Sequence, residues 1–260
     1  MIISSSVIGA LVLAVILTFL APIIILIVLN KKNIISPKPM WFGVLAFFIS
    51  QICLRIPILS VLAKQNWYVT FAQQDRTAYI LLAAFTAGLF EETARFIGAR
   101  FCLKPSERRY RDAVAFGLGH GFCECVLLVG LAAEVTNLVN CLLLNSGAVN
   151  LSNPTGAQLA AVLTKQLSVP AILMAIWERV GTVIFHLSAT IFVFRGVQEK
   201  KIGWYFVALA AHTVADSIPT LIAGSNMLLN ESIGFAISLV LLVFAVRMKP
   251  KFEEGHPLAA

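Results

Sequence analysis

The chain has 260 residues, of which 59% are hydrophobic and only 13% are charged, and its mean hydropathy is +0.87. A water-soluble domain of this length needs more polar surface, so the composition excludes that class and indicates a helical membrane protein. The net charge of +7 does not indicate nucleic-acid binding, because the basic residues lie between apolar runs, where orientation in a lipid bilayer accounts for them.

Long apolar runs follow one another along the chain. A membrane-spanning helix needs about 20 apolar residues. Segments near that length lie at 5–29, 40–63, 77–101, 112–133, 169–194, 202–223 and 231–247. The sequence therefore predicts an all-α, polytopic membrane helical bundle of about seven transmembrane helices, forming a single integral-membrane domain over residues 1–260. Region 134–168 predicts either a long fourth helix or a short re-entrant or interfacial piece after it.

The basic residues alternate between loops, which predicts the orientation in the membrane. The second loop has Lys64 and Arg76, the fourth has Lys165 and the sixth has none. The first, third and fifth loops and the C-terminal tail hold most of the others: Lys31, Lys32, Lys38, Lys104, Arg108, Arg109, Arg111, Arg195, Lys200, Lys201, Arg247, Lys249 and Lys251. We therefore expect a multi-pass protein of a bacterial cytoplasmic membrane, with its N-terminus outside and its C-terminus in the cytoplasm.

Ionisable residues interrupt four of the predicted helices. On insertion scales a charged side chain at the bilayer centre costs about 2.5–3.5 kcal/mol, so such residues should face the interior of the bundle. In chain order they are Glu91, Glu92, Arg95, His120, Glu124, Glu178, Arg179, His186, His212 and Asp216. A further one, Arg55 in the second helix, is expected to be structural, as is Glu178.

Several of these residues are predicted to share one depth. Glu91, His120 and His186 each lie nine residues from the nearest loop arginine, and His212 lies eleven residues from Lys201. At 1.5 Å per residue this is roughly 14–16 Å, close to the midplane of a hydrocarbon core of about 30 Å. Four helices are therefore expected to bring a carboxylate or an imidazole to one level.

Acids and histidines at one level suit general acid–base chemistry. A carboxylate can take a proton from water and return it to a leaving amine, while a histidine holds the developing oxyanion. We favour this reading, with no metal or other cofactor. The alternative is a zinc ion bound by His120, His186 and His212 together with Glu124 or Asp216. We favour it less because the HExxH signature of many zinc proteases is absent. A polar network that only holds the bundle together is the structural alternative.

Three short motifs carry a resemblance to a known family. Residues 91–95 (EETAR), 116–120 (FGLGH) and 212–216 (HTVAD) resemble the EExxxR, FxxxH and HxxxN/D motifs of the CAAX prenyl protease and bacteriocin-processing group. Within that clan, GHGFCE at 119–124 and WER at 177–179 look most like the YhfC-like branch of glutamic intramembrane proteases. The related PrsW group and APH-1 are more distant. One departure is that Arg95 follows Glu91 by four residues instead of five, which leaves its partner open.

The resemblance implies an intramembrane endopeptidase with a catalytic four-helix core at about 85–220. It implies that Glu91 activates water with the help of Glu92, that His120 and His212 stabilise the transition state, and that Asp216 orients His212. The supporting residues of this site are expected to be Arg95, Glu124, His186, Asp216, Glu178 and Arg179.

The expected substrate is a membrane protein or a lipidated peptide, and the oligomeric state stays open. One alternative is a non-catalytic membrane scaffold like APH-1. Another is a zinc-dependent CAAX-type protease. A proton-coupled transporter is a third, although such proteins commonly contain an internal repeat and this sequence shows none.

Overall fold

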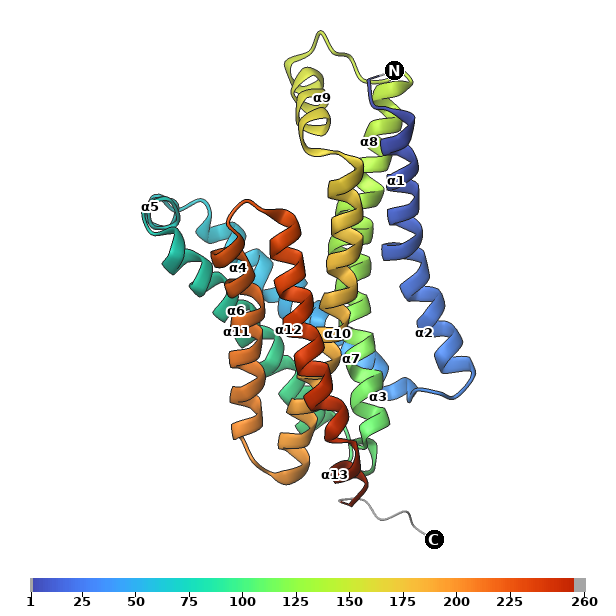
Figure 1. Ribbon diagram of the computed structural model, residues 1–260, viewed down its shortest axis with the longest axis vertical. Coiled ribbons are helices and arrows are strands. Elements are labelled where there is room, and N and C mark those ends of the chain that lie inside the picture. The colour runs from blue at the N-terminus through green and yellow to red at the C-terminus, as the bar shows by residue number, and fades with distance from the viewer. Residues whose placement is uncertain (1, 255–260) are drawn as a thin grey trace. The chain divides into compact units, whose positions relative to one another are not determined.

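The computed structural model describes residues 2–254, and every regular element in this range is helical (Figure 1). Six helices within it are long and apolar enough to cross a membrane: Ser5–Lys31, Pro37–Leu62, Tyr110–Asn145, Val169–Glu199, Gly203–Ala223 and Met227–Arg247. The prediction of an all-α polytopic membrane bundle is confirmed. The number of spans and the orientation in the membrane stay predictions.

The segment expected as the third span is helical over its predicted length. Helix α6 (Arg76–Ile97) begins at an Asp75 cap and continues as the π-helical segment η3 (Gly98–Cys102). It is not among the six apolar helices. Its second half holds the two acids and the arginine singled out above. Whether α6 lies at bilayer depth therefore depends on how these three charges are compensated inside the bundle.

Region 134–168 contains the end of a long fourth helix, one of the two structures that the sequence left open, while a re-entrant or interfacial placement of the piece after it stays a prediction. Helix α7 (Tyr110–Glu124) continues through π-helical η5 (Cys125–Val135) into α8 (Thr136–Asn145). These 36 residues form one helix of about 54 Å, longer than a hydrocarbon core of about 30 Å. A separate short helix, α9 (Pro154–Gln166), follows.

The chain divides into two compact units, and the prediction of a single domain remains untested. The first unit consists of Met1–Ile27 with Glu124–Arg179. Here α1 (Ser5–Val15) and π-helical η1 (Ile16–Leu20) pack against η5 and α8. The Asn145 amide accepts hydrogen bonds from the backbone N–H groups of Ile2 and Ile3, both at 2.9 Å. The core of this unit contains Ile3, Ala10, Leu11, Ala14, Cys141, Leu144, Leu163 and Ile172.

The second unit consists of Val28–Cys123 with Val180–Ala260. Helix α6 packs along α11 (Gly203–Ala223), and α11 packs along α12 (Met227–Arg247). A core of apolar side chains from several helices includes Phe116, Phe192, Phe194 and Phe252. The remaining helices with residues in this unit are α2 (Ala21–Lys31), α3 (Pro37–Phe47), η2 (Phe48–Arg55), α4 (Ile56–Leu62), α5 (Asn66–Gln74), η4 (Pro105–Glu107), α10 (Val169–Glu199), α11 (Gly203–Ala223), α12 (Met227–Arg247) and α13 (Lys249–Glu254).

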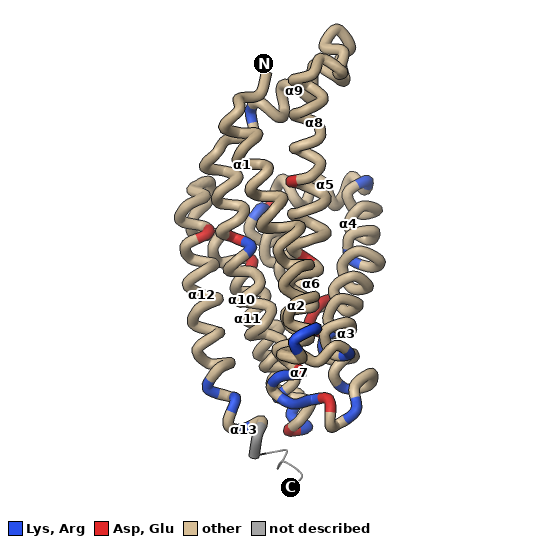
Figure 2. Tube along the Cα trace, turned by 90° about the vertical axis from the view of Figure 1, so that its right-hand side faces the viewer, with Lys and Arg blue, Asp and Glu red and all other residues tan. Residues whose placement is uncertain are grey.

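Most Lys and Arg residues of the second unit gather at one end, where α7 begins and α13 lies (Figure 2). The first, third and fifth loops and the tail meet there, as the alternation of basic loops predicts. The loops are also tied to each other, because Lys38 Nζ donates to Glu107 Oε2 at 2.7 Å. This hydrogen bond to the ammonium group lowers the pKa of Glu107 below its usual value.

Two glycines allow α3 and α7 to touch through their backbones. A Cβ atom on Gly43 would overlap the carbonyl of Phe116, and one on Gly119 would overlap the carbonyl of Met40. The neighbours are backbone atoms, which cannot move aside as a flexible side chain can. The contact therefore sets the distance between the helix that carries His120 and the helix beside it.

We expect Gly119→Ala to destabilise the protein by about 1–3 kcal/mol, because the added methyl forces two packed backbones apart. The control is Gly9→Ala, where a Cβ meets no atom within 4 Å. There alanine should gain up to about 1 kcal/mol from helix propensity. Thermal unfolding in detergent measures both variants, and equal midpoints would show that the helices can separate without cost.

Candidate active site

Helix α6 places two acids and an arginine inside the second unit. Glu91 is 5% exposed, and Glu92 and Arg95 are fully buried. The spacing puts Arg95 one turn after both acids, so its guanidinium reaches Glu92 Oε1 and lies 3.2 Å from Glu91 Oε2. The partner of Arg95, which the sequence left open, is therefore both glutamates. One buried cation compensates two carboxylates that would otherwise repel each other.

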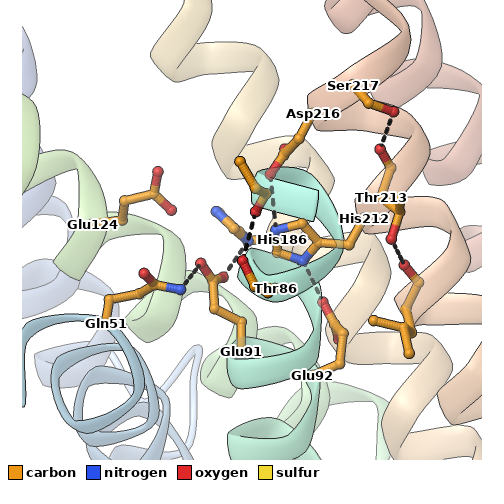
Figure 3. A network of polar contacts seen from close by, with 12 residues as sticks. Gln51, Thr86, Glu91, Glu92, Glu124, His186, His212, Thr213, Asp216 and Ser217 are labelled. Carbon is orange, nitrogen blue, oxygen red and sulfur yellow. Dashed lines mark hydrogen bonds and ion pairs between the residues drawn. The ribbon is translucent and has the colours of Figure 1, made fainter. Parts of the chain in front are cut away.

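Three histidines from three other helices meet this strip, and Figure 3 shows two of them, His186 and His212. His120 on α7 donates from Nε2 to Glu91 Oε2 at 2.9 Å. His212 on α11 donates from Nδ1 to Glu92 Oε1 at 2.8 Å. Arg95 donates from Nη2 to Nδ1 of His186 on α10 at 2.6 Å. The four helices expected to share a polar level do bring these side chains together.

The hydrogen bonds determine which ring nitrogens carry protons. An ionised carboxylate only accepts, so the proton lies on Nε2 of His120 and on Nδ1 of His212. A guanidinium only donates, so Nδ1 of His186 presents a lone pair to the cluster. Nδ1 of His120 is buried and has no hydrogen-bond partner in residues 2–254. Moving the proton of His120 from Nε2 to Nδ1 would therefore break the hydrogen bond to Glu91 and no other.

The cluster contains a group of donors that fits a metal ion. One donor atom each from Glu91, His120 and His186 lies within 4.8 Å of the other two. A carboxylate with two imidazoles is a donor set of catalytic zinc sites that leave one position open. Nδ1 of His186 lies 3.7 Å from Glu91 Oε2, and moving the proton of His120 to its unpartnered Nδ1 would free Nε2. The residues present therefore fit a metal.

Arg95 occupies part of the same space. Its Nη2 is within hydrogen-bond distance of Glu91 Oε2 and His186 Nδ1, two of the three donors. The guanidinium thus stands where a shared cation would stand, and it must turn aside when an ion binds. The donor group also differs from the expected zinc set of three histidines, because His212 is turned toward Glu92.

One oxygen of Glu92 is unusual. Its Oε1 is bound by His212 and Arg95, whereas its Oε2 is buried with no partner in the described chain. A buried acceptor without a donor costs about 1–3 kcal/mol, so this oxygen marks a position that a water molecule or a substrate group can fill.

Gln51 on η2 belongs to the cluster, although the sequence analysis did not predict it as a site residue. It is 3% exposed, and its Nε2 donates to Glu91 Oε1 at 2.9 Å. Arg55 Nη1 lies 3.3 Å from Gln51 Oε1, and Arg55 Nη2 donates to the Ala83 carbonyl at 2.7 Å. Arg55, expected to be structural, therefore orients the amide that holds Glu91. The spacing of Gln51 and Arg55, four residues apart in an apolar run, is the sequence feature that could have indicated this contact.

The remaining predicted residues are placed differently. Asp216 lies 3.5 Å from His212 Nε2 with its side chain 42% exposed, so it faces the ring nitrogen that Glu92 does not use. Glu124, Glu178 and Arg179 belong to the first unit, where Arg179 pairs with Glu124 at 2.9 Å and with Glu178. These three form an ion-pair group of their own.

The sequence matches the model of the family described as YhfC intramembrane metalloprotease over residues 17–238, a range that includes the whole cluster. It is also 25% identical over 203 residues to the uncharacterized membrane protein YhfC of Bacillus subtilis (strain 168). That alignment covers 76% of this chain and 78% of the relative. No solved structure matches the chain.

Proposed function

This chain belongs to the YhfC intramembrane metalloprotease family, and from that membership we propose that its buried acid–histidine cluster is the active site of a metal-dependent intramembrane peptidase. The family resemblance drawn from the three motifs and the multi-pass membrane location are confirmed. The family description supports intramembrane protease activity. It does not support the expectation that the enzyme needs no metal, and the glutamic type of catalysis stays a prediction.

The observation that carries the proposal is the convergence of Glu91, His120 and His186. These side chains would hold a divalent ion such as zinc, which when bound would polarise the peptide carbonyl and make a water molecule more nucleophilic. Gln51 keeps Glu91 in place through the oxygen that faces away from the two histidines. Removing the Gln51 amide would leave that oxygen free to rotate.

Glu92 is the general base of the proposed reaction. Its Oε2 has no hydrogen-bond partner among residues 2–254 and accepts a proton from water, while the water oxygen bonds to the carbonyl carbon. The same proton then passes from Glu92 to the peptide nitrogen as the C–N bond breaks, which leaves a carboxylate and an amine. Arg95 and His212 both donate to Oε1, so they hold Glu92 in its ionised form between turnovers.

His212 positions Glu92 and supplies positive potential. Its Nδ1–H is engaged by Glu92, and Asp216 faces its Nε2. With a carboxylate at each nitrogen, a proton on the second nitrogen would be stabilised from both sides. The ring can therefore support the oxyanion that forms when the carbonyl is attacked.

The substrate proposed for this site is a membrane-anchored or membrane-adjacent polypeptide, including lipidated peptides. The acids and histidines are buried in a multi-pass membrane protein, so a peptide bond reaches them from the bilayer more directly than from bulk water. No contact with nucleic acid is proposed.

A second candidate, metal-free glutamic hydrolysis, is favoured by Arg95. Its Nη2 already fills the position between Glu91 and His186, which supplies a cation without any bound ion. In this mechanism Glu91 takes the proton from water, Glu92 assists, and His120 with His212 stabilises the oxyanion. The two candidates differ in whether activity follows metal content.

The deciding experiment compares wild type, Glu91→Gln and Glu134→Gln purified in detergent without chelator. Glu134 is the control because it is a buried acid of the first unit. We expect one divalent ion per chain and cleavage of transmembrane or lipidated test peptides for wild type and Glu134→Gln, and loss of both for Glu91→Gln, since one ligand is gone. Chelation should remove wild-type activity, and zinc should restore it.

The outcomes separate the candidates. Cleavage that survives removal of the ion but is lost in Glu91→Gln would replace the metal mechanism by the glutamic one. No cleavage by wild type, with every variant equally stable, would favour a scaffold of the APH-1 kind.

A further inference from the structure

An apolar groove runs beside the acidic strip in the second unit. Its volume is about 470 Å³. One wall comes from α3 and η2, and the other from α6 and η3. We call it the α6 groove, and the residues that line it are Phe42, Leu45, Ala46, Ile49, Ser50, Leu54, Leu89, Phe90, Thr93, Ala94, Ile97, Gly98 and Cys102.

The lining of the groove offers almost no hydrogen bonds. Its two hydroxyls are already used, because Ser50 Oγ donates to the Phe47 carbonyl at 3.2 Å and Thr93 Oγ1 bonds the Tyr205 hydroxyl at 3.0 Å. An extended peptide placed there would leave its own backbone polar groups unsatisfied. The chemistry of the lining therefore fits hydrocarbon.

The groove is too small to enclose a helical peptide. The α6 wall extends from Leu89 to Cys102, a length of about 20 Å at 1.5 Å per residue. A helix about 10 Å across and equally long would fill on the order of 1,500 Å³, so the groove could not enclose it. A single hydrocarbon chain is long and thin enough to enter.

A positive charge stands at the Cys102 end of the groove. Arg100 is exposed, and among the described residues its guanidinium makes no ion pair and lies 5.9 Å from the centre of the Phe101 ring. Phe101 is 73% exposed, more than any other large apolar side chain of the described range. The acid of the following loop, Glu107, is paired with Lys38. An aromatic ring and an unpaired cation at a helix end are the features that bind the headgroup region of anionic lipids.

We propose that the α6 groove binds one acyl chain of an anionic phospholipid, with the lipid phosphate at Arg100. The chain runs from the basic end of the second unit toward Ser50 and Phe90. These two residues precede Gln51 and Glu91, whose hydrogen bond joins the two walls of the groove. A bound acyl chain fills the space between the same two walls, so the lipid supports the geometry of the acidic strip and stabilises the folded protein.

The experiment is native mass spectrometry of the full chain in detergent, with added phosphatidylglycerol or phosphatidylcholine of identical acyl chains. We expect wild type to retain one phosphatidylglycerol in preference to phosphatidylcholine. Arg100→Gln should lower phosphatidylglycerol affinity about fivefold, as expected for one basic residue worth about 1 kcal/mol, and should remove the preference. Arg76→Gln, an exposed arginine at the other end of α6, is the control and should retain it.

A second pair of variants tests the groove itself. Ile97 is 48% exposed and lines the groove, whereas Leu82 is 43% exposed on the same helix and does not. Ile97→Trp should fill the groove and reduce retention of both lipids, and Leu82→Trp should change neither.

Three results would overturn the proposal. One is equal retention of the two lipids by wild type, and another is unchanged retention by Ile97→Trp. The third is displacement of the lipid by an apolar transmembrane peptide, which would make a peptide the occupant. The measurement needs no proteolysis, and Glu91→Gln should retain the lipid, so the inference and the proposed enzymatic function can fail separately.

Discussion

Replacing Glu92 by glutamine should lower peptide cleavage by about 10²–10⁴-fold while the protein keeps its fold and its metal, because the substitution removes only the proposed proton acceptor. The side chain keeps its size, and Arg95 and His212 can still donate to the amide oxygen that replaces Oε1. None of the three proposed metal donors is changed. Turnover of a transmembrane peptide, metal content and thermal stability should be measured on the same preparation.

Glu134→Gln is a closely matched control for this prediction. Glu134 is also buried, and its Oε2 also lacks a partner in the part of the chain that the structure describes, but it lies in the first unit on η5. Glu134→Gln should leave turnover unchanged, because an unpartnered carboxylate oxygen outside the cluster does not take part in the reaction. If Glu92→Gln cleaved peptide at the wild-type rate, Glu92 would not be the general base. Loss of the ion together with turnover would instead place Glu92 among the ligands.

Replacing Arg95 by leucine should destabilise the metal-free protein by about 3–5 kcal/mol, the usual loss when one partner of a buried ion pair is removed. Glu91 and Glu92 would then face each other in a buried site without their shared cation. The measurement is thermal unfolding after chelation. Arg76→Leu, an exposed arginine on the same helix, should change the midpoint little.

The metal gives this prediction a second part. A ligand that binds only the folded state stabilises it by mass action, and Arg95 competes with the ion for Glu91 and His186. Added zinc should therefore raise the unfolding midpoint of Arg95→Leu more than that of wild type. Equal shifts in both proteins would show that the guanidinium and the ion do not share these donors. If metal-free Arg95→Leu unfolded at the same temperature as wild type, the pair of acids would need no cation.

Much of the architecture followed from local sequence. Helix positions could be predicted because a spanning helix is a continuous apolar run, which neighbouring helices do not alter. The burial of the acids and histidines followed from the high cost of charge in a bilayer. The i,i+4 spacing of Glu91 and Arg95 places both on one face of a helix, although the sequence left the partner of Arg95 open.

The contacts between helices were decided by the tertiary structure. His186 was predicted to share a level with Glu91, but only the rotation of α10 about its axis turns its Nδ1 toward Arg95. The rotation of α11 turns His212 toward Glu92. The three histidines therefore do not form the donor set of the zinc alternative. Gln51 enters the cluster because η2 packs beside α6.

The sequence by itself determined a helical membrane bundle, the family and most of the polar cluster, with Gln51 as the exception. The tertiary structure alone decided which of those residues touch: it joined Glu91 to His120 and His186, and it sent Glu124 and Arg179 to the other unit. The physical reason is that the rise along a helix sets the depth of a residue. Its direction and distance from the next helix depend on side-chain packing and on close backbone contacts such as that of Gly119 with Met40.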